Sequence, residues 1–281
     1  AGIGPELHPL LGHPIAGAVA HGRGDPGCAD TVGDEHRVGD FEGDIHRRPG
    51  HPALLVDLPC RYRVEGGKQA VEAVDRLGGE GRLLWHGDED LGGVDAVIVP
   101  GGFAHGDYLR PGAIARFSPV MAGVAAFAAG GGPVLGICNG FQILTEAGLL
   151  PGALQKNSGL KFLCQPTTVR VETSNSVLTS RATVGVELSI PINHFEGNYT
   201  CDGETLARLI DGDRIVLRYT DNPNGSIDDI AGVCNEARNV VGLMPHPERA
   251  CSELLGSADG AVLLGSLLDS GPVVAGLQDR R

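Results

Sequence analysis

Three short apolar runs, at residues 95–99, 133–137 and 239–244, constrain the fold of this chain more than any other feature. Each run is continuous rather than alternating, which is typical of strands that are covered on both faces. Segments with helical spacing of apolar residues lie at 67–77 and 119–129. This order predicts an α/β fold, with a mainly parallel sheet and helices on both faces.

Other regions add to this fold prediction. Residues 162–220 contain alternating, β-branched segments, which predict added antiparallel strands and hairpins. Shorter strands are expected at 53–58 and 82–85, and a final helix at 260–268.

Residues 1–52 differ from the rest of the chain in composition. They are rich in Gly, Pro, His and Asp, hold six of the ten histidines, and keep no regular spacing of apolar residues. Such a segment buries too little surface to offset the entropy of ordering it, so we expect 1–52 to be disordered or a non-native extension. The histidine spacings fit no known metal site, and no metal is expected. The folded domain is expected at 53–272, followed by a flexible tail at 273–281.

Charge and cysteine content argue against several classes of protein. The net charge of −13 disfavours binding to nucleic acid, because both molecules would be negative. No apolar stretch reaches the roughly 18 residues that a membrane span needs. The seven cysteines are scattered, without a C-x-x-C pair, which predicts free thiols and a cytoplasmic location.

The strand at 133–137 runs into a G-x-C-x-G motif, in which Gly136 and Gly140 flank Cys138. This pattern is typical of a nucleophile on a strained turn between a strand and a helix, where glycines allow other backbone to come close. The following helix would present its N-terminus to the sulfur, which favours the thiolate. A buried cysteine between two packing glycines fits the same residues, so the motif alone leaves both interpretations open.

A thiol nucleophile needs a base, and the chain offers two segments of the form His-x-Glu, at 194–196 and 246–248. The second directly follows the strand at 239–244, whose end is expected at the same sheet edge as the cysteine. We therefore predict His246 as the base and Glu248 as the group that orients it. The first segment falls in a loop flanked by Gly and Asn.

A glycine pair, Gly101 and Gly102, follows the strand at 95–99. A glycine turn at the carboxyl end of a strand can direct backbone N–H groups toward that edge of the sheet. The pair therefore predicts a second donor for an oxyanion, although a simple tight turn explains two glycines equally well.

These motifs together resemble those of a known family. The runs G-I-C-N-G-F-Q at 136–142 and M-P-H-P-E-R at 244–249 look like the class I, or triad, glutamine amidotransferases. The segments at 101–110, 194–199 and 222–226 are similar to one branch of that family, the glutaminase subunits of phosphoribosylformylglycinamidine synthase.

The resemblance spans residues 71–268 and implies roles for the matching residues. Cys138 would attack the side-chain amide of glutamine and form a thioester. His246 would take the thiol proton and give it to the leaving ammonia, and Glu248 would orient His246.

The resemblance also implies the rest of the site and its partners. Gly102 and the Asn139 N–H would hold the oxyanion, and Gln142 would contact glutamine. Ammonia would pass to a separate synthetase subunit, which uses ATP and Mg to amidate formylglycinamide ribonucleotide in purine biosynthesis, with a small accessory subunit also expected. No cofactor is expected on this chain. The loops 194–199 and 222–226 would lie near the partner, or form ordinary turns.

The first strand departs from the family pattern. The family begins with I-G-V-V-x-F-P-G-S-N, whereas residues 53–63 read A-L-L-V-D-L-P-C-R-Y-R and lack the Gly/Asn turn. In the family that turn lies beside the glutamine site. Two other hypotheses therefore stay open: a subunit for a different synthetase, and an inactive docking module.

Overall fold

The structure is a computed structural model, which describes residues 53–54, 65–102, 110 and 112–271. These residues belong to one compact unit, Ile45–Arg281. The segments predicted at 1–52 and 273–281 lie outside the described residues, as does 55–58 of the first expected strand. No helix within the described ranges is long and apolar enough to cross a membrane.

Strands and helices alternate along the described part of the chain. In chain order they are β1 (Ala53–Leu54), α1 (Glu65–Arg76), β2 (Glu80–Gly81), β3 (Val97–Val99), α2 (Pro119–Ala129), β4 (Val134–Ile137), α3 (Asn139–Glu146), β5 (Ala153–Gln155), β6 (Leu163–Val171), β7 (Glu187–His194), β8 (Asn198–Thr200), α4 (Gly203–Asp211), β9 (Ile215–Tyr219), β10 (Ile230–Cys234), β11 (Val240–Leu243) and α5 (Gly260–Asp269). This order confirms the predicted α/β class.

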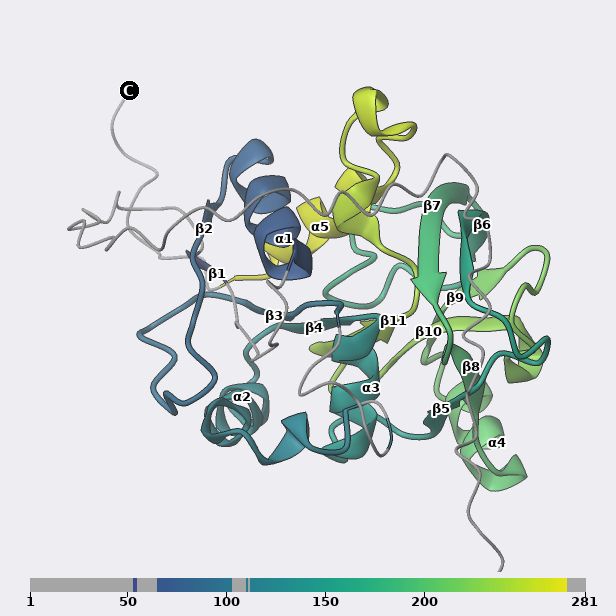
Figure 1. The fold of residues 1–281 in the computed structure, drawn as a ribbon, viewed down its shortest axis with the longest axis horizontal. Helices are drawn as coiled ribbons and strands as arrows, with labels where there is room; N and C mark the ends of the chain where they lie inside the picture. The colour runs from purple at the N-terminus through teal and green to yellow at the C-terminus, as the bar shows by residue number, and fades with distance from the viewer. Residues whose placement is uncertain (1–52, 55–64, 103–109, 111, 272–281) are drawn as a thin grey trace, which may run out of the picture. The chain divides into compact units, whose positions relative to one another are not determined.

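The main sheet has seven strands in the order β3-β4-β11-β10-β9-β6-β7 (Figure 1). Its first three strands are parallel to one another, and the other four continue the sheet in antiparallel fashion, which confirms the added antiparallel strands. Ile137, the last residue of β4, pairs with Leu243, the last residue of β11. The residues that follow these two strands therefore leave the sheet at the same edge.

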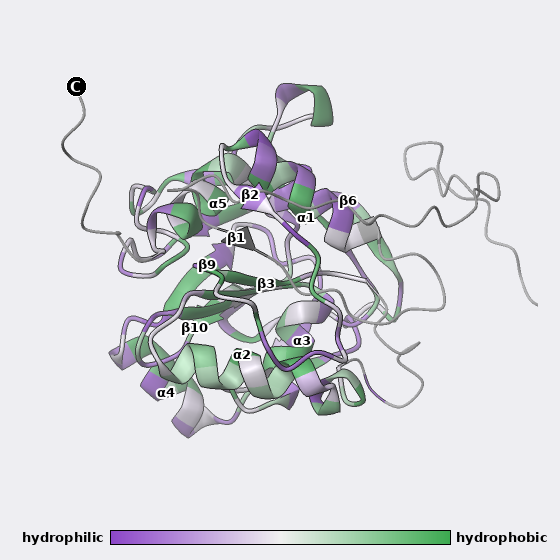
Figure 2. Ribbon diagram, turned by 90° about the vertical axis from the view of Figure 1, so that its left-hand side faces the viewer, coloured by the Kyte–Doolittle hydropathy of each residue, from purple (hydrophilic) through white to green (hydrophobic). Residues whose placement is uncertain are grey.

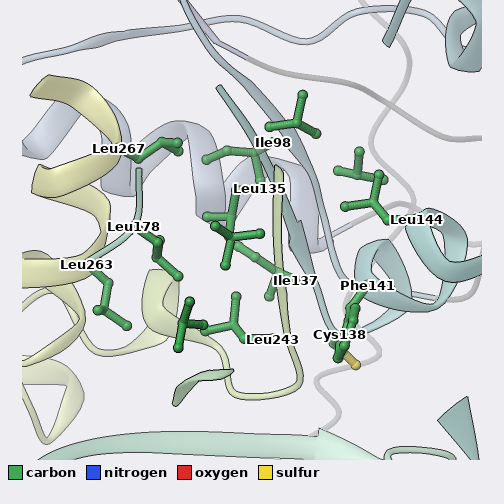
Figure 3. Close-up of a cluster of buried hydrophobic side chains, with 14 of the residues drawn as sticks. Ile98, Leu135, Ile137, Cys138, Phe141, Leu144, Leu178, Leu243, Leu263 and Leu267 are labelled. Atoms are coloured by element: carbon green, nitrogen blue, oxygen red, sulfur yellow. The ribbon is translucent and has the colours of Figure 1, made fainter. Parts of the chain in front are cut away.

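Helices cover both faces of the parallel strands. Figure 2 shows α1 and α5 on one side of the sheet and α2 and α3 on the other. Figure 3 shows Ile98, Leu135 and Ile137 packed with Leu263 and other leucines, and Cys138 at the edge of this cluster. Each buried aliphatic side chain of this kind stabilises the fold by about 1.5–3 kcal/mol. The strands that position Cys138 are thus held by a hydrophobic core.

One strand prediction is wrong, and another segment contains a helix that was not predicted. The short strand expected at 82–85 lies instead at Glu80–Gly81, where it pairs with β1. Leu83 and Trp85 are exposed, and only Leu84 between them packs against the core. The segment 162–220 holds the predicted antiparallel strands and, in addition, helix α4, which the sequence prediction did not include. Asp202 caps this helix, accepting a hydrogen bond from the Thr205 N–H at 2.7 Å.

Candidate active site

Cys138 lies at the junction of β4 and α3, as the G-x-C-x-G motif predicts. It is the N-cap of α3 and has φ 51° and ψ −105°, a conformation that non-glycine residues rarely adopt. Its N–H donates to the Leu243 carbonyl at 2.8 Å, and its side chain is only 7% exposed. Strain of this kind persists only where the surroundings enforce it, and it is concentrated at functional sites.

The two glycines of the motif have a steric role. A methyl group at Gly140 would lie 1.8 Å from the Val99 carbonyl oxygen, and one at Gly136 would lie 2.8 Å from the Gly140 carbonyl carbon. Both values are far below van der Waals contact, so β3, β4 and α3 can meet only if these positions lack side chains. This closeness brings the end of β3 next to Cys138.

His246 and Glu248 come to the same edge from the end of β11. The His246 Nδ1 and the Glu248 Oε1 are 2.6 Å apart, and both side chains are almost completely buried. Because a carboxylate only accepts hydrogen bonds, Nδ1 carries the hydrogen and Nε2 is left to exchange a proton. No atom of the described residues forms a hydrogen bond with the His246 Nε2.

The pKa of His246 reflects competing influences. Burial is the largest of them and acts to lower the pKa, but the carboxylate of Glu248 and the sulfur of Cys138 together outweigh it. The pKa of His246 is raised to about 9 as a result. The cationic ring is therefore favoured at neutral pH.

Strand β7 contacts both His246 and Cys138 through its backbone carbonyls. β7 is the last strand of the sheet, yet its Pro191 carbonyl accepts from the His246 N–H at 2.8 Å. Two residues further on, the Asn193 carbonyl accepts from the Cys138 Sγ at 3.6 Å. The antiparallel half of the sheet thus folds back onto the ends of β4 and β11, which the sequence prediction did not include.

The two glycines after β3 occupy different environments. Gly101 is buried, and a methyl group there would lie 2.8 Å from the His246 Cε1 and 3.4 Å from the Cys138 Cβ. Gly102, the residue predicted to aid the oxyanion, is exposed and has a φ of 135°. Gly101 is therefore the residue that packs against both Cys138 and the imidazole of His246.

Asn139 and Gln142 lie in the first turn of α3, and their side chains bond to each other. The Asn139 Nδ2 donates to the Gln142 Oε1 at 2.8 Å. The Gln142 Nε2 donates to the Glu196 carbonyl at 2.5 Å. The amide of Gln142, predicted to contact substrate, therefore links α3 to the loop after β7. The backbone N–H of Asn139 belongs to the helix start, where N–H groups point out of the helix.

The other His-x-Glu segment is also close to the site, which the sequence prediction did not anticipate. His194 is buried, and its Nδ1 lies 3.1 Å from the Asn157 Oδ1. Burial and, secondarily, the charge of His246 lower the pKa of His194 to about 4. Glu196 takes part through its backbone carbonyl, to which Gln142 donates. The sequence signal was the alternation of β7, whose buried row ends in a histidine.

The loops at 194–199 and 222–226 bond to each other. Asn224 is fully buried, and its Nδ2 donates to the Gly197 carbonyl at 2.8 Å. The Tyr199 N–H donates to the Ser226 Oγ at 3.0 Å. The Asn222 Oδ1 accepts from the Asn224 N–H at 3.3 Å, as in an Asx turn, and also from the Gly225 N–H at 2.8 Å. These contacts favour the turn and packing interpretation of both loops.

Known proteins are similar in sequence to most of the described chain. Residues 80–259 match the CobB/CobQ-like glutamine amidotransferase domain. The phosphoribosylformylglycinamidine synthase subunit PurQ of Rubrobacter xylanophilus is 60% identical over 201 residues, which cover 72% of this chain and 91% of that protein. The corresponding subunit of Alkaliphilus metalliredigens is 50% identical over 217 residues, covering 77% of this chain and 92% of that protein.

A solved structure agrees with the sequence matches. The structure of PurLQS from Thermotoga maritima contains a chain that superposes with a TM-score of 0.70 and 40% sequence identity. The match covers 78% of this chain and 98% of that one. The fold expected for class I glutamine amidotransferases is thereby confirmed, and the chain belongs to the family of PurQ subunits of phosphoribosylformylglycinamidine synthase.

Proposed function

We propose that this chain is the glutaminase subunit of phosphoribosylformylglycinamidine synthase, and that Cys138, His246 and Glu248 hydrolyse glutamine. The observation that carries the proposal is the strained Cys138 at the start of α3, beside a buried imidazole held by a carboxylate at 2.6 Å. A buried cysteine with a purely packing role requires neither the strained backbone nor the charged pair.

The reaction follows from the protonation of these groups. The Cys138 thiolate attacks the carboxamide carbon of glutamine, and a carbon–sulfur bond forms. The His246 Nε2–H gives its proton to the amide nitrogen, the carbon–nitrogen bond breaks, and neutral ammonia leaves. His246 then takes a proton from water, whose oxygen attacks the thioester carbon. The carbon–sulfur bond then breaks, the Cys138 thiolate is restored with His246 again protonated, and the new carboxyl group of glutamate loses its proton to solvent.

Glu248 and the backbone near Cys138 support these steps. Glu248 fixes the tautomer of His246, so that Nε2 rather than Nδ1 moves the proton. The Asn139 N–H and the turn at Gly102 would donate to the oxyanion that forms when the carbonyl is attacked. Gln142 would contact glutamine, and its bonds to Asn139 and Glu196 would set its position.

The ammonia is proposed to serve a synthetase subunit. The relatives are named as subunits of phosphoribosylformylglycinamidine synthase, and the Thermotoga structure carries the name PurLQS. By this analogy a synthetase would use ATP and Mg to convert formylglycinamide ribonucleotide into formylglycinamidine ribonucleotide, and a small accessory subunit would complete the assembly. No cofactor is proposed for the present chain.

The proposal is tested by reconstitution with the synthetase subunits. The complex should form product from either glutamine or ammonium chloride. Cys138→Ala should abolish the glutamine-dependent reaction and leave the ammonium-dependent one, which takes place on the partner. Glutamine-dependent product from the Cys138→Ala complex would overturn the proposal. A parent complex that uses only ammonium chloride would instead support the docking-module hypothesis.

A further inference from the structure

Beside the candidate active site, His194 holds a buried ring nitrogen that lacks a hydrogen-bond partner in the described part of the chain. Only 3% of His194 is exposed, and no described residue forms a hydrogen bond with its Nε2. A buried polar atom without a partner is costly, and it calls for an explanation such as a missing ligand or water. Neither the proposed mechanism nor the packing of the loop accounts for this one.

The hydrogen bonds of Asn157 fix the tautomer of His194. The Asn157 Nδ2 donates to the Lys161 and His194 carbonyls, at 2.9 and 3.0 Å. Its Oδ1 accepts from the Gly197 N–H at 3.1 Å, so the orientation of the amide is determined. Because Oδ1 is an acceptor, the His194 Nδ1 must carry the hydrogen. In the neutral ring, Nε2 is then an acceptor only.

His194 lies close in the chain to the residue that contacts the nucleophile, Cys138. His194 directly follows Asn193, whose carbonyl accepts from the Cys138 sulfur at 3.6 Å. The charge of His246 also contributes to the low pKa of His194, so the two rings lie within electrostatic reach. The same segment holds two more buried acceptors, the Oδ1 atoms of Asn193 and Asn198, that form no hydrogen bond within the described part of the chain.

These features define what would fill the site. The ligand must donate hydrogen bonds, because the unpartnered atoms accept them. A cation is disfavoured, because burial and the charge of His246 both oppose positive charge at this position. Ammonia meets both conditions, and it must remain unprotonated to act as a nucleophile in a later step.

We propose that the His194 Nε2 accepts a hydrogen bond from the ammonia that leaves Cys138 and is its first binding station toward the partner. This inference rests on the proposed glutaminase function and assigns the departing nitrogen to one atom. His194 is thereby a binding residue for the product, whereas His246 moves the proton.

The test compares two variants in the complete complex. His194→Asn keeps a donor near the Nδ1 position for Asn157 and removes the Nε2 acceptor. His194→Gln reaches the Nε2 position with an amide oxygen. The readout is the ratio of amidated product to glutamate, which does not depend on the rate of hydrolysis, and amidation with ammonium chloride checks that the partner is intact.

The expected ratio for the parent is close to one product per glutamate. His194→Asn should lower it by about fivefold, as expected for the loss of one hydrogen bond to a neutral ligand, while His194→Gln should retain most of it. An unchanged ratio in His194→Asn would overturn the proposal. An equal fall in both variants would also overturn it, because it would assign His194 a purely structural role.

A second measurement does not depend on the folding of a variant. In the parent chain with 15N-labelled histidine, ammonium chloride added above the pKa of ammonium should shift the His194 Nε2 resonance. Sodium chloride at equal ionic strength should leave it in place, and a resonance that ammonia does not move contradicts the site. This result is independent of catalysis, so a failure of the proposed glutaminase function remains distinguishable.

Discussion

The two His-x-Glu segments have the same sequence pattern, but the pKa values of their histidines are shifted in opposite directions. His246 and His194 are both almost completely buried, at 2% and 3% exposed. The Nδ1 of His246 bonds to the carboxylate of Glu248, whereas the Nδ1 of His194 bonds to the neutral amide of Asn157. The pKa of the first is raised to about 9, and the pKa of the second is lowered to about 4.

The local backbone explains the difference. Pro247–Arg249 forms a 3-10 turn, which curls the carboxylate of Glu248 back to the ring two residues earlier. His194 ends strand β7, where the chain runs on into a loop, and Glu196 contributes its backbone carbonyl to Gln142 instead. The turn after the histidine, rather than the His-x-Glu spacing itself, decides which pair can act as base and orienter.

Replacing the glutamate of each segment by glutamine should give the largest difference in turnover between the two segments. Glu248→Gln removes the charge that holds His246 in its working tautomer, and glutamine-dependent turnover should fall by about 10³- to 10⁴-fold. Glu196→Gln leaves the backbone carbonyl in place, and turnover should stay near the parental value. Steady-state glutamate production in the complex measures both. Equal losses in the two variants would contradict the assignment of the base.

Two glycines offer a second matched comparison, because each lies against one of the rings. A methyl group at Gly101 would lie 2.8 Å from the His246 Cε1, and one at Gly197 would lie 2.3 Å from the His194 Cε1. Gly101→Ala should displace His246 and lower turnover by about 100-fold. Gly197→Ala should overpack the Asn157 network and lower the free energy of unfolding by about 1–3 kcal/mol.

Turnover and urea denaturation, measured on both glycine variants, test this contrast. The larger loss of turnover must belong to Gly101→Ala. A larger loss of turnover in Gly197→Ala than in Gly101→Ala, at the same loss of stability, would contradict the assignment of His246 rather than His194 as the base.

The pH dependence of stability should have opposite signs for the two histidines. The raised pKa of His246 contributes stability that is fully present below 6.5 and is lost as the pH rises through about 9. The lowered pKa of His194 destabilises the fold as the pH falls from 6.5 through about 4, because the unfolded chain then binds a proton that the folded chain does not.

Urea denaturation at pH 7 and pH 5 isolates the His194 contribution. The parent should lose about 2 kcal/mol more stability than His194→Gln over this interval, since one unit of pKa shift corresponds to about 1.4 kcal/mol. Groups that titrate in both proteins cancel in the difference. Equal losses would mean that His194 is not held neutral in the fold.

Gln142 connects the two regions and should give the smallest effect. Its amide bonds to Asn139 and to the Glu196 carbonyl, so Gln142→Leu removes both bonds and leaves buried partners unsatisfied. The free energy of unfolding should fall by about 1–3 kcal/mol, as measured by denaturant titration. A parental stability together with a raised KM for glutamine would indicate a substrate contact alone.

Local sequence patterns predicted much of the fold, and they predicted that Cys138 and His246 follow strands that end at the same edge of the sheet. The continuous apolar runs located β3, β4 and β11, and the glycine spacing located the turn at Cys138, because both features follow from contacts between neighbours in sequence. The return of β7 onto the site could not be predicted, since the bonds from Pro191 and Asn193 join residues 55 positions apart. Helix α4 was missed although Asp202 gave a capping signal.

The central claim is that Cys138 is a nucleophile activated by His246, and covalent labelling tests it most directly. The complex is treated with a glutamine analogue that carries an electrophilic carbon, and the modified residue is identified by peptide mass spectrometry. The parent should be labelled at Cys138, and His246→Asn, which keeps a donor for Glu248 but lacks Nε2, should react far more slowly. A parent without label at Cys138, or a His246→Asn variant labelled at the parental rate, would contradict the account.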